Sequence, residues 1–139
     1  MIVVDTNVLS EMLKDKPSPV VVRWYKSVPR RSCFVTAITQ AEMSAGAATM
    51  PEGKHRTELI ETVEKLFEED FADRTLSFDG KAARRYAEIM LQRRRAGMPI
   101  STLDAQIAAI AREKGMAVAT RNIRDFNDCG VELIDPWAA

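Results

Sequence analysis

Four acidic side chains stand where predicted strands and helices of this 139-residue chain meet: Asp5, Glu42, Asp104 and Asp125. Carboxylates that converge without a basic partner repel each other, by roughly 4 kcal/mol per pair at about 4 Å and an effective dielectric of about 20. A divalent cation removes that repulsion, and a site with oxygen ligands only favours Mg²⁺ or Mn²⁺. The chemistry expected of these residues is therefore metal-assisted and directed at a phosphate group.

Helix capping is the competing interpretation of each acid. Segments 39–42 and 101–104 match the capping-box pattern, segment 122–125 matches it more loosely, and Asp5 is placed to cap the first helix. Taken singly, each acid fits capping better than catalysis. The set favours a metal site, because Asp104 shares a helical face with Ile107 and Ala108, and Asp5 follows a strand expected to be buried. A charge in such a place needs a partner.

Other catalytic chemistries are excluded by composition. The only histidine, His55, lies in a polar stretch that reads as an exposed helix start, so sites that need two histidines are ruled out. Cys33 and Cys129 lie far apart and form neither a zinc motif nor a disulfide framework, which indicates a reducing cytoplasm. No phosphate-binding glycine motif occurs, and no apolar run is long enough for a membrane span or a signal peptide.

Charge is balanced overall and uneven locally. Twenty basic and twenty acidic side chains give a formal net charge of zero, which excludes a chain held to nucleic acid by bulk charge. Residues 58–73 contain seven acids and one lysine, whereas residues 81–95 contain six bases and one glutamate. Two solvated helix faces explain this pattern best. The alternative is that the basic segment contacts an RNA backbone through Arg84, Arg85, Arg93, Arg94 and Arg95.

The predicted elements place the acids in space. We expect strands at 1–4, 32–36, 75–78, 116–120 and 131–134, and helices at 8–14, 20–28, 39–49, 57–69, 81–96 and 103–114. Strands that alternate with helices predict an α/β fold with a parallel sheet, in one domain over residues 1–139. Ligands of such sheets bind beyond the carboxyl ends of the strands. Topology alone brings Asp5, Glu42 and the pair Asn122/Asp125 to that edge. Asp104 joins them only if the turn at 97–101 returns its helix there.

The chain resembles PIN domains, specifically ribonuclease toxins of the VapC type with a FitB-like variant. The resemblance covers the whole chain and is carried, in order, by segments 2–7, 37–42, 103–109, 118–122, 125–126 and 136–137. It implies a three-layer α/β/α domain with a parallel sheet of four to five strands. It also implies Mg²⁺-dependent endonucleolytic hydrolysis of RNA, a cognate antitoxin that blocks the site, and homodimers that assemble further with the antitoxin.

The resemblance also implies roles for individual residues. Asp5 and Asp104 match the principal metal-binding aspartates, and Glu42 matches the glutamate of the family. The fourth acidic position falls on Asn122, so Asp125, one helical turn later, is expected to stand in. The polar residues expected to orient the first aspartate are Asn7 and Thr120.

Two other functions remain open from the sequence. A haloacid-dehalogenase-type phosphatase also begins with an apolar strand that ends in aspartate, but it needs a second aspartate where this chain has Asn7. A non-catalytic module that binds RNA or protein would lack acids, and here only the Asn122 position departs from the pattern.

Overall fold

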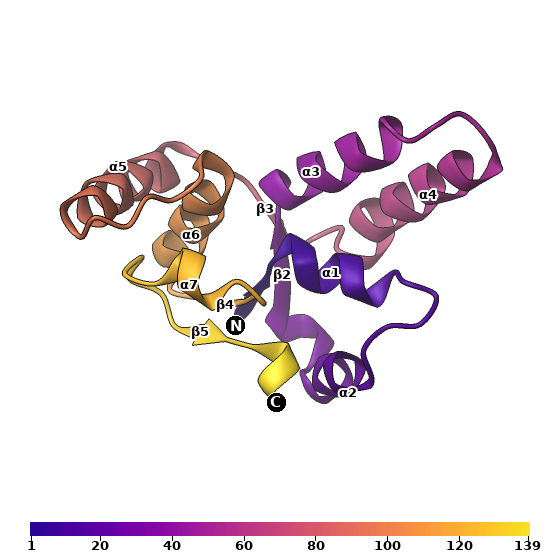
Figure 1. Ribbon diagram of the computed structural model, residues 1–139, viewed down its shortest axis with the longest axis horizontal. Helices are drawn as coiled ribbons and strands as arrows, with labels where there is room; N and C mark the ends of the chain where they lie inside the picture. The colour runs from indigo at the N-terminus through magenta and orange to yellow at the C-terminus, as the bar shows by residue number, and fades with distance from the viewer.

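A parallel sheet of five short strands forms the centre of the computed structural model, which describes all 139 residues (Figure 1). The strands are β1 (Ile2–Val4), β2 (Cys33–Thr36), β3 (Thr75–Leu76), β4 (Ala117–Ala119) and β5 (Leu133–Ile134), in the order β3-β2-β1-β4-β5. All neighbouring strands pair in parallel. The predicted parallel α/β fold with its sheet of four to five strands is therefore confirmed.

Seven α-helices surround this sheet. They are α1 (Thr6–Met12), α2 (Pro19–Ser27), α3 (Ala37–Ala48), α4 (Lys54–Lys65), α5 (Gly80–Arg95), α6 (Thr102–Lys114) and α7 (Ile123–Phe126). A π-helical turn at Leu66–Asp70 extends α4, and short 3₁₀ turns lie at Arg30–Ser32 and Pro136–Ala138. None of the helices combines the length and the apolar character that crossing a bilayer requires.

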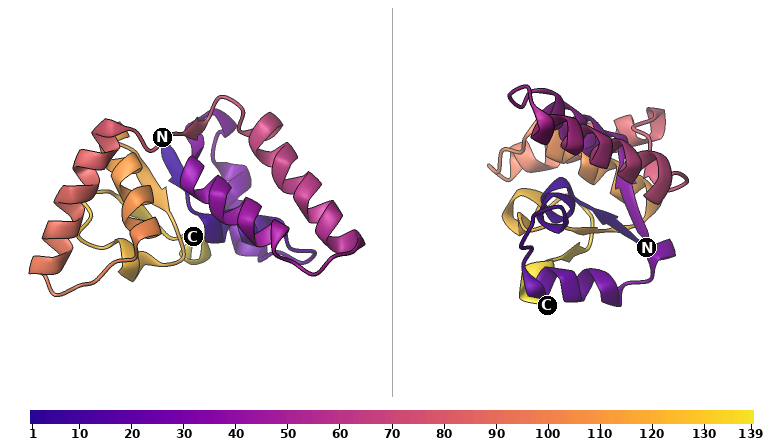
Figure 2. Two further views of the ribbon diagram at one scale, coloured as in Figure 1. Left: turned by 90° about the horizontal axis from the view of Figure 1, so that it is seen from above. Right: turned by 90° about the vertical axis from the view of Figure 1, so that its right-hand side faces the viewer.

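The two faces of the sheet are covered by different helices. Val3 packs into a core cluster formed with α5, α6 and α7, whereas its neighbour Val4 packs into a second cluster formed with α1, α2, α3 and α4. Successive strand residues point to opposite faces, so fully apolar strands are what a sheet buried on both sides requires. Helix α6 lies between α5 and the strands, with α3 and α4 on the other side (Figures 1 and 2). The expected three-layer arrangement is confirmed.

Two local predictions were wrong, and one short helix was not predicted as an element. Helix α4 begins at Lys54, three residues before the predicted start. The segment from Ile123 to Phe126 is helical, although its four residues are too few to show a periodic pattern. Helix α3 is capped by Thr36, whose side chain accepts a hydrogen bond from the backbone of Thr39, so segment 39–42 is no capping box.

The strand order creates a switch point between β1 and β4. From β1 the chain adds β2 and β3 on one side, then crosses to add β4 and β5 on the other. The crevice beyond the carboxyl ends of β1 and β4 is the place where open parallel sheets bind ligands. Asp5 directly follows β1, and its backbone N–H donates to the carbonyl of Ala119 in β4 (2.9 Å). The first of the predicted site residues therefore stands at the switch point.

Candidate active site

A polar pocket of about 440 Å³ opens at this switch point. Its lining consists of Asp5, Thr6, Asn7, Ser10, Glu11, Lys14, Glu42, Asp104, Arg121, Asn122 and Trp137, of which only Trp137 is hydrophobic. Three of the predicted acids line it. Asp5 follows the end of β1, Glu42 lies in the second turn of α3, and Asp104 lies in the first turn of α6. Segments more than thirty residues apart in sequence thus contribute carboxylates to one pocket.

Asp5 is the most buried carboxylate of the chain, with 4% of its surface exposed. One carboxylate oxygen accepts the backbone N–H of Thr6 at 2.8 Å, and the other accepts the hydroxyl of Thr120 at 2.7 Å. Burial raises the pKa of Asp5 to about 6; the two hydrogen bonds oppose this shift, and the negative charges of Asp104 and Glu42 add to it. Asp5 caps α1 as predicted, but a capping role needs no such burial among like charges.

Thr120 connects the residues around Asp5. Its hydroxyl donates to Asp5 and accepts both the side-chain amide of Asn7 (3.3 Å) and the backbone N–H of Asn122 (3.0 Å). The other end of the Asn7 amide accepts the backbone N–H of Arg121 at 3.2 Å. These bonds lock the loops after β1 and β4 together and fix the orientation of the Asp5 carboxylate. The structure places Asn7 and Thr120 where an orienting role requires them.

Asp104 reaches the pocket because the loop between α5 and α6 returns the start of α6 to this edge. Ser101 caps α6 by accepting the backbone N–H of Asp104 at 3.2 Å, which leaves the half-buried carboxylate to line the pocket. Burial raises the pKa of Asp104; the Ser101 hydroxyl opposes this shift, and the charge of Asp125 adds to it. Like Asp5, Asp104 is a carboxylate whose ionised form lacks full compensation within the protein.

Glu42 lies across the pocket on α3. Its Oε1 accepts the hydroxyl of Thr6 at 2.9 Å, so the residue that follows Asp5 also orients Glu42. Because Thr36, and not Thr39, caps α3, Glu42 is free of any capping function. The remaining oxygen of its carboxylate accepts no hydrogen bond from the protein and is available to a ligand.

Asn122 and Asp125 occupy different environments. Asn122 lines the pocket, and its side chain makes no capping bond to α7, contrary to the looser capping pattern. Asp125 is exposed on α7 and does not line the pocket; it influences the site through its charge on Asp104. The structure therefore brings Asp5, Glu42 and Asp104 together with Asn122 and leaves Asp125 at the periphery.

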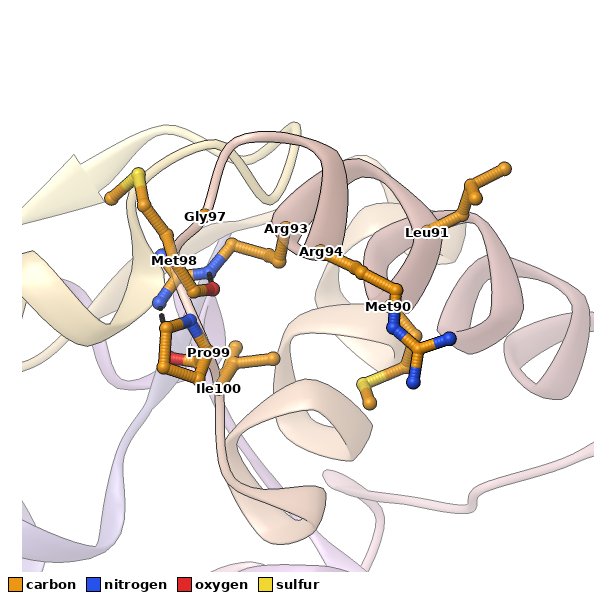
Figure 3. Close-up of a pocket in the computed structure, with 8 residues that line it drawn as sticks. All are labelled: Met90, Leu91, Arg93, Arg94, Gly97, Met98, Pro99 and Ile100. Atoms are coloured by element: carbon orange, nitrogen blue, oxygen red, sulfur yellow. Dashed lines mark hydrogen bonds between the residues drawn. The ribbon is translucent and has the colours of Figure 1, made fainter.

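None of the five arginines expected to contact RNA lines this pocket. Arg93 needs a correction, because its side chain is 3% exposed and its guanidinium donates to four backbone carbonyls, those of Met98, Pro99, Arg124 and Asn127. Figure 3 shows the guanidinium beside Met98 and Pro99, at an apolar hollow of about 560 Å³ formed by α5 and the following loop. Arg93 thus fixes the loop that leads to Asp104 and is closed to RNA.

The other four arginines lie on the outer surface of α5. Arg85 is paired with Glu113 at 2.8 Å and with Glu88 at 3.2 Å, which agrees with a solvated charged helix face. The side chains of Arg84, Arg94 and Arg95 are exposed.

Six lining residues were not singled out from the sequence. Four of them are charged or aromatic, namely Glu11, Lys14, Arg121 and Trp137, and the other two are Thr6 and Ser10. Arg121 and Trp137 lie inside the segments 118–122 and 136–137 that carry the family resemblance, so position within a motif was the available signal. Glu11 and Lys14 had no such signal. They belong to the first helix and its end, and only the fold brings them to the pocket.

The donor set suits a hard divalent cation. The pocket contains carboxylate, hydroxyl and amide oxygens and no histidine or cysteine. No three or more His, Cys, Asp or Glu side chains converge closely enough to hold an ion as its sole ligands. Mg²⁺ usually keeps several waters and takes only one or two protein carboxylates, so this spacing fits it better than it fits a metal that needs a closed cage. Asp5, Asp104 and Glu42 are the residues that fit such an ion.

Comparisons with known proteins agree with this geometry. The sequence matches the PIN domain family over residues 2–131. It is 42% identical over 139 residues to plasmid stability protein StbB of Pseudomonas syringae pv. tomato, with all of both chains covered. It is also 40% identical to VapC ribonuclease Y4jK of Sinorhizobium fredii, with 99% of this chain and 98% of that protein covered.

A solved structure allows a direct check on the fold described here. The crystal structure of FitAcB from Neisseria gonorrhoeae superposes with a TM-score of 0.94 at 37% identity, and the match covers all of both chains. The helices, strands and strand order of this chain are therefore those of a protein family with known three-dimensional structures.

Proposed function

The chain belongs to the PIN domain family, and we propose that it is a metal-dependent endoribonuclease, the toxin of a type II toxin–antitoxin pair. The observation that supports this most strongly is that Asp5, Glu42 and Asp104 all line one pocket at the switch point of the sheet. The named relatives include a VapC ribonuclease and toxin FitB. Residues 1–139 act as one domain in this proposal, since a single sheet supports both core clusters.

Mg²⁺ or Mn²⁺ is the cofactor of the proposed reaction, held by Asp5 and Asp104 with Glu42. Bound there, the cation would lower the pKa of a water molecule and neutralise charge on the scissile phosphate. The protein contributes a fixed, ionised Asp5, since the Thr6 N–H and the Thr120 hydroxyl hold both of its oxygens in place. Preorganised ligands of this kind do not have to rearrange during the reaction.

Glu42 is the acid best placed to orient the attacking water. One of its oxygens is fixed by Thr6, and the other is unengaged at the pocket surface. Asp125 acts from the periphery, where its charge adds to the rise in the pKa of Asp104 that burial causes. Water adds to phosphorus and the bond from phosphorus to the 3′ oxygen breaks. The products are a 5′-phosphate and a 3′-hydroxyl, as the family resemblance implies.

A cognate antitoxin neutralises the toxin, as the toxin–antitoxin complexes among the structural relatives indicate. We expect a basic side chain of the antitoxin to enter the pocket near Asp5 and Asp104, because uncompensated carboxylates favour a cation. The toxin is proposed to form homodimers that assemble further with the antitoxin. A reducing cytoplasm suits the chain, since Cys33 and Cys129 are both buried and unpaired.

Cleavage of total RNA by the purified chain tests the proposal. We expect cleavage with Mg²⁺ or Mn²⁺, none with EDTA, and none by the Asp104→Asn variant. Hydrolysis of a small phosphoester would instead support a phosphatase; Asn7 argues against this, because its amide is engaged with Thr120 and Arg121 and supplies no second carboxylate. A chain that binds RNA with Mg²⁺ present and leaves it intact would be a non-catalytic module.

A further inference from the structure

Arg121 and Trp137 both line the active-site pocket. The guanidinium carbon of Arg121 lies 5.0 Å from the centroid of the Trp137 ring, within the range of a cation–π interaction. Arg121 follows Thr120, the residue that fixes Asp5, and its own backbone N–H is bound to Asn7. The backbone of Arg121 is therefore tied to the loops that hold the Asp5 carboxylate.

Arg121 differs from Lys14, the other cation of the pocket, in having no salt-bridge partner. Four carboxylates line it, Asp5, Glu11, Glu42 and Asp104, together with two cations, Lys14 and Arg121. Lys14 is neutralised by Glu11, with 3.0 Å between the charged atoms. Arg121 forms no salt bridge with any of these carboxylates and is held over an aromatic ring instead. It is the only cation of the pocket whose charge is left for a ligand.

Trp137 gives this cation a fixed support. Its indole packs against the core cluster of α1–α4, the preceding Pro136 is buried, and its backbone N–H donates to the carboxylate of Asp135 at 2.9 Å. An anchored ring restricts the long arginine side chain to one region of the pocket wall. The five donors of a guanidinium then face solvent in a planar arrangement that matches phosphate oxygens.

We propose that Arg121, supported by Trp137, binds a phosphate of the RNA chain next to the scissile one. The inference rests on the proposed ribonuclease function and adds a substrate subsite to it. A polyanion that approaches a pocket lined by four carboxylates needs a compensating positive charge on the protein, and Arg121 supplies it. Arg121 is then a substrate-binding residue outside the metal ligands, and Trp137 is a positioning residue that acts through it.

The experiment uses total RNA to map a cleavage site, and then a short single-stranded RNA that spans that site. For Arg121→Ala we expect KM to rise roughly tenfold, as for the loss of one charged contact, with kcat within about twofold. The slope of log KM against log salt should become shallower by about 0.7, the value for one phosphate contact on a single strand. The Mg²⁺ concentration that gives half-maximal cleavage should stay unchanged.

Matched variants separate the subsite from general charge effects. Arg31→Ala removes the same charge from an exposed arginine at the amino end of β2, opposite the pocket, and should leave KM unchanged. Arg121→Lys should restore part of the affinity, because it keeps the charge and loses the planar fork. Trp137→Phe should retain more affinity than Trp137→Leu, because it keeps an aromatic face beneath the cation.

A neutral methylphosphonate linkage, moved along the same RNA, locates the contact. In wild type, the neutral linkage should weaken RNA binding at one position adjacent to the cut. In Arg121→Ala, the neutral linkage at that position should not weaken RNA binding further. Equal KM and equal salt slopes for wild type and Arg121→Ala would overturn the inference while the ribonuclease function stands. Unchanged RNA kinetics with weaker antitoxin binding would assign Arg121 to the antitoxin instead. A wild-type chain that cleaves no RNA would refute the proposed function itself.

Discussion

The hydroxyl of Thr120 donates a 2.7 Å hydrogen bond to the carboxylate of Asp5, across 115 positions of sequence. This bond lowers the pKa of Asp5 against the effect of burial, so its loss should raise that pKa further above about 6. In Thr120→Val, protons should compete more strongly with Mg²⁺ for Asp5. If the pKa rises by about one unit, the half-maximal Mg²⁺ concentration for RNA cleavage should rise roughly fivefold at pH 6 and hardly change at pH 8.

Thr120→Ser is the matched control, because it keeps the hydroxyl and should retain the wild-type Mg²⁺ requirement. Thr120→Val also removes the acceptor for Asn7 and for the backbone of Asn122, which should lower the free energy of unfolding by about 1–3 kcal/mol. An Mg²⁺ requirement that is the same for valine and serine at pH 6 would contradict an orienting role for the hydroxyl.

Arg93 should matter for stability rather than for RNA binding. Its guanidinium joins the loop before α6, through the carbonyls of Met98 and Pro99, to the end of α7, through that of Asn127. Arg93→Met leaves these carbonyls without a donor, so we expect the free energy of unfolding to fall by roughly 2–4 kcal/mol. Arg94→Met, at the exposed neighbouring position, should change it by less than about 0.5 kcal/mol. Urea denaturation of the two variants measures the difference, and equal effects would be inconsistent with this role.

Two of the site residues follow from the sequence pattern, whereas the placement of Asp104 depends on the buried Arg93. Asp5 and Glu42 were predicted to share an edge because each follows a strand of a parallel sheet, and the structure places both in the pocket. Asp104 depended on the course of residues 97–101, which Arg93 fixes from inside. A buried arginine in a run of three looks like its exposed neighbours, so neither its role nor the helix at Ile123–Phe126 could be read from periodicity.

Glu42 and Asp125 should differ in their effect on cleavage. Glu42 lines the pocket with one unengaged carboxylate oxygen, whereas Asp125 is exposed and outside the lining. We expect Glu42→Gln to lower kcat about a hundredfold or more, in the range for a residue that assists proton transfer, and Asp125→Asn to lower it less than tenfold. Single-turnover RNA cleavage at saturating Mg²⁺ measures both. A larger loss for Asp125→Asn would move the water-orienting role to α7.

Asp5→Asn tests whether the buried carboxylate destabilises the metal-free protein. The pKa of Asp5 is raised from 3.8 to about 6, so the folded state binds a proton at this carboxylate more tightly than the unfolded chain does. The contribution of protonated Asp5 to the free energy of unfolding is complete below about pH 4 and is lost as the pH rises through about 6. In EDTA, the free energy of unfolding of Asp5→Asn relative to wild type should therefore increase between pH 4 and pH 7, by as much as about 3 kcal/mol. Since asparagine caps helices about as well as aspartate, this pH-dependent difference does not come from α1.

Addition of Mg²⁺ should make wild type more stable than Asp5→Asn, the reverse of their order in EDTA. An ion that binds only the folded state stabilises it, by about 2.7 kcal/mol at a concentration a hundred times its Kd. Wild type should gain melting temperature with Mg²⁺, whereas Asp5→Asn should gain much less and should cleave no RNA. Asp104→Asn should behave like Asp5→Asn, because the two carboxylates are proposed to share one ion. An Asp5→Asn protein that cleaves RNA and keeps the wild-type response to Mg²⁺ would show that Asp5 only caps α1.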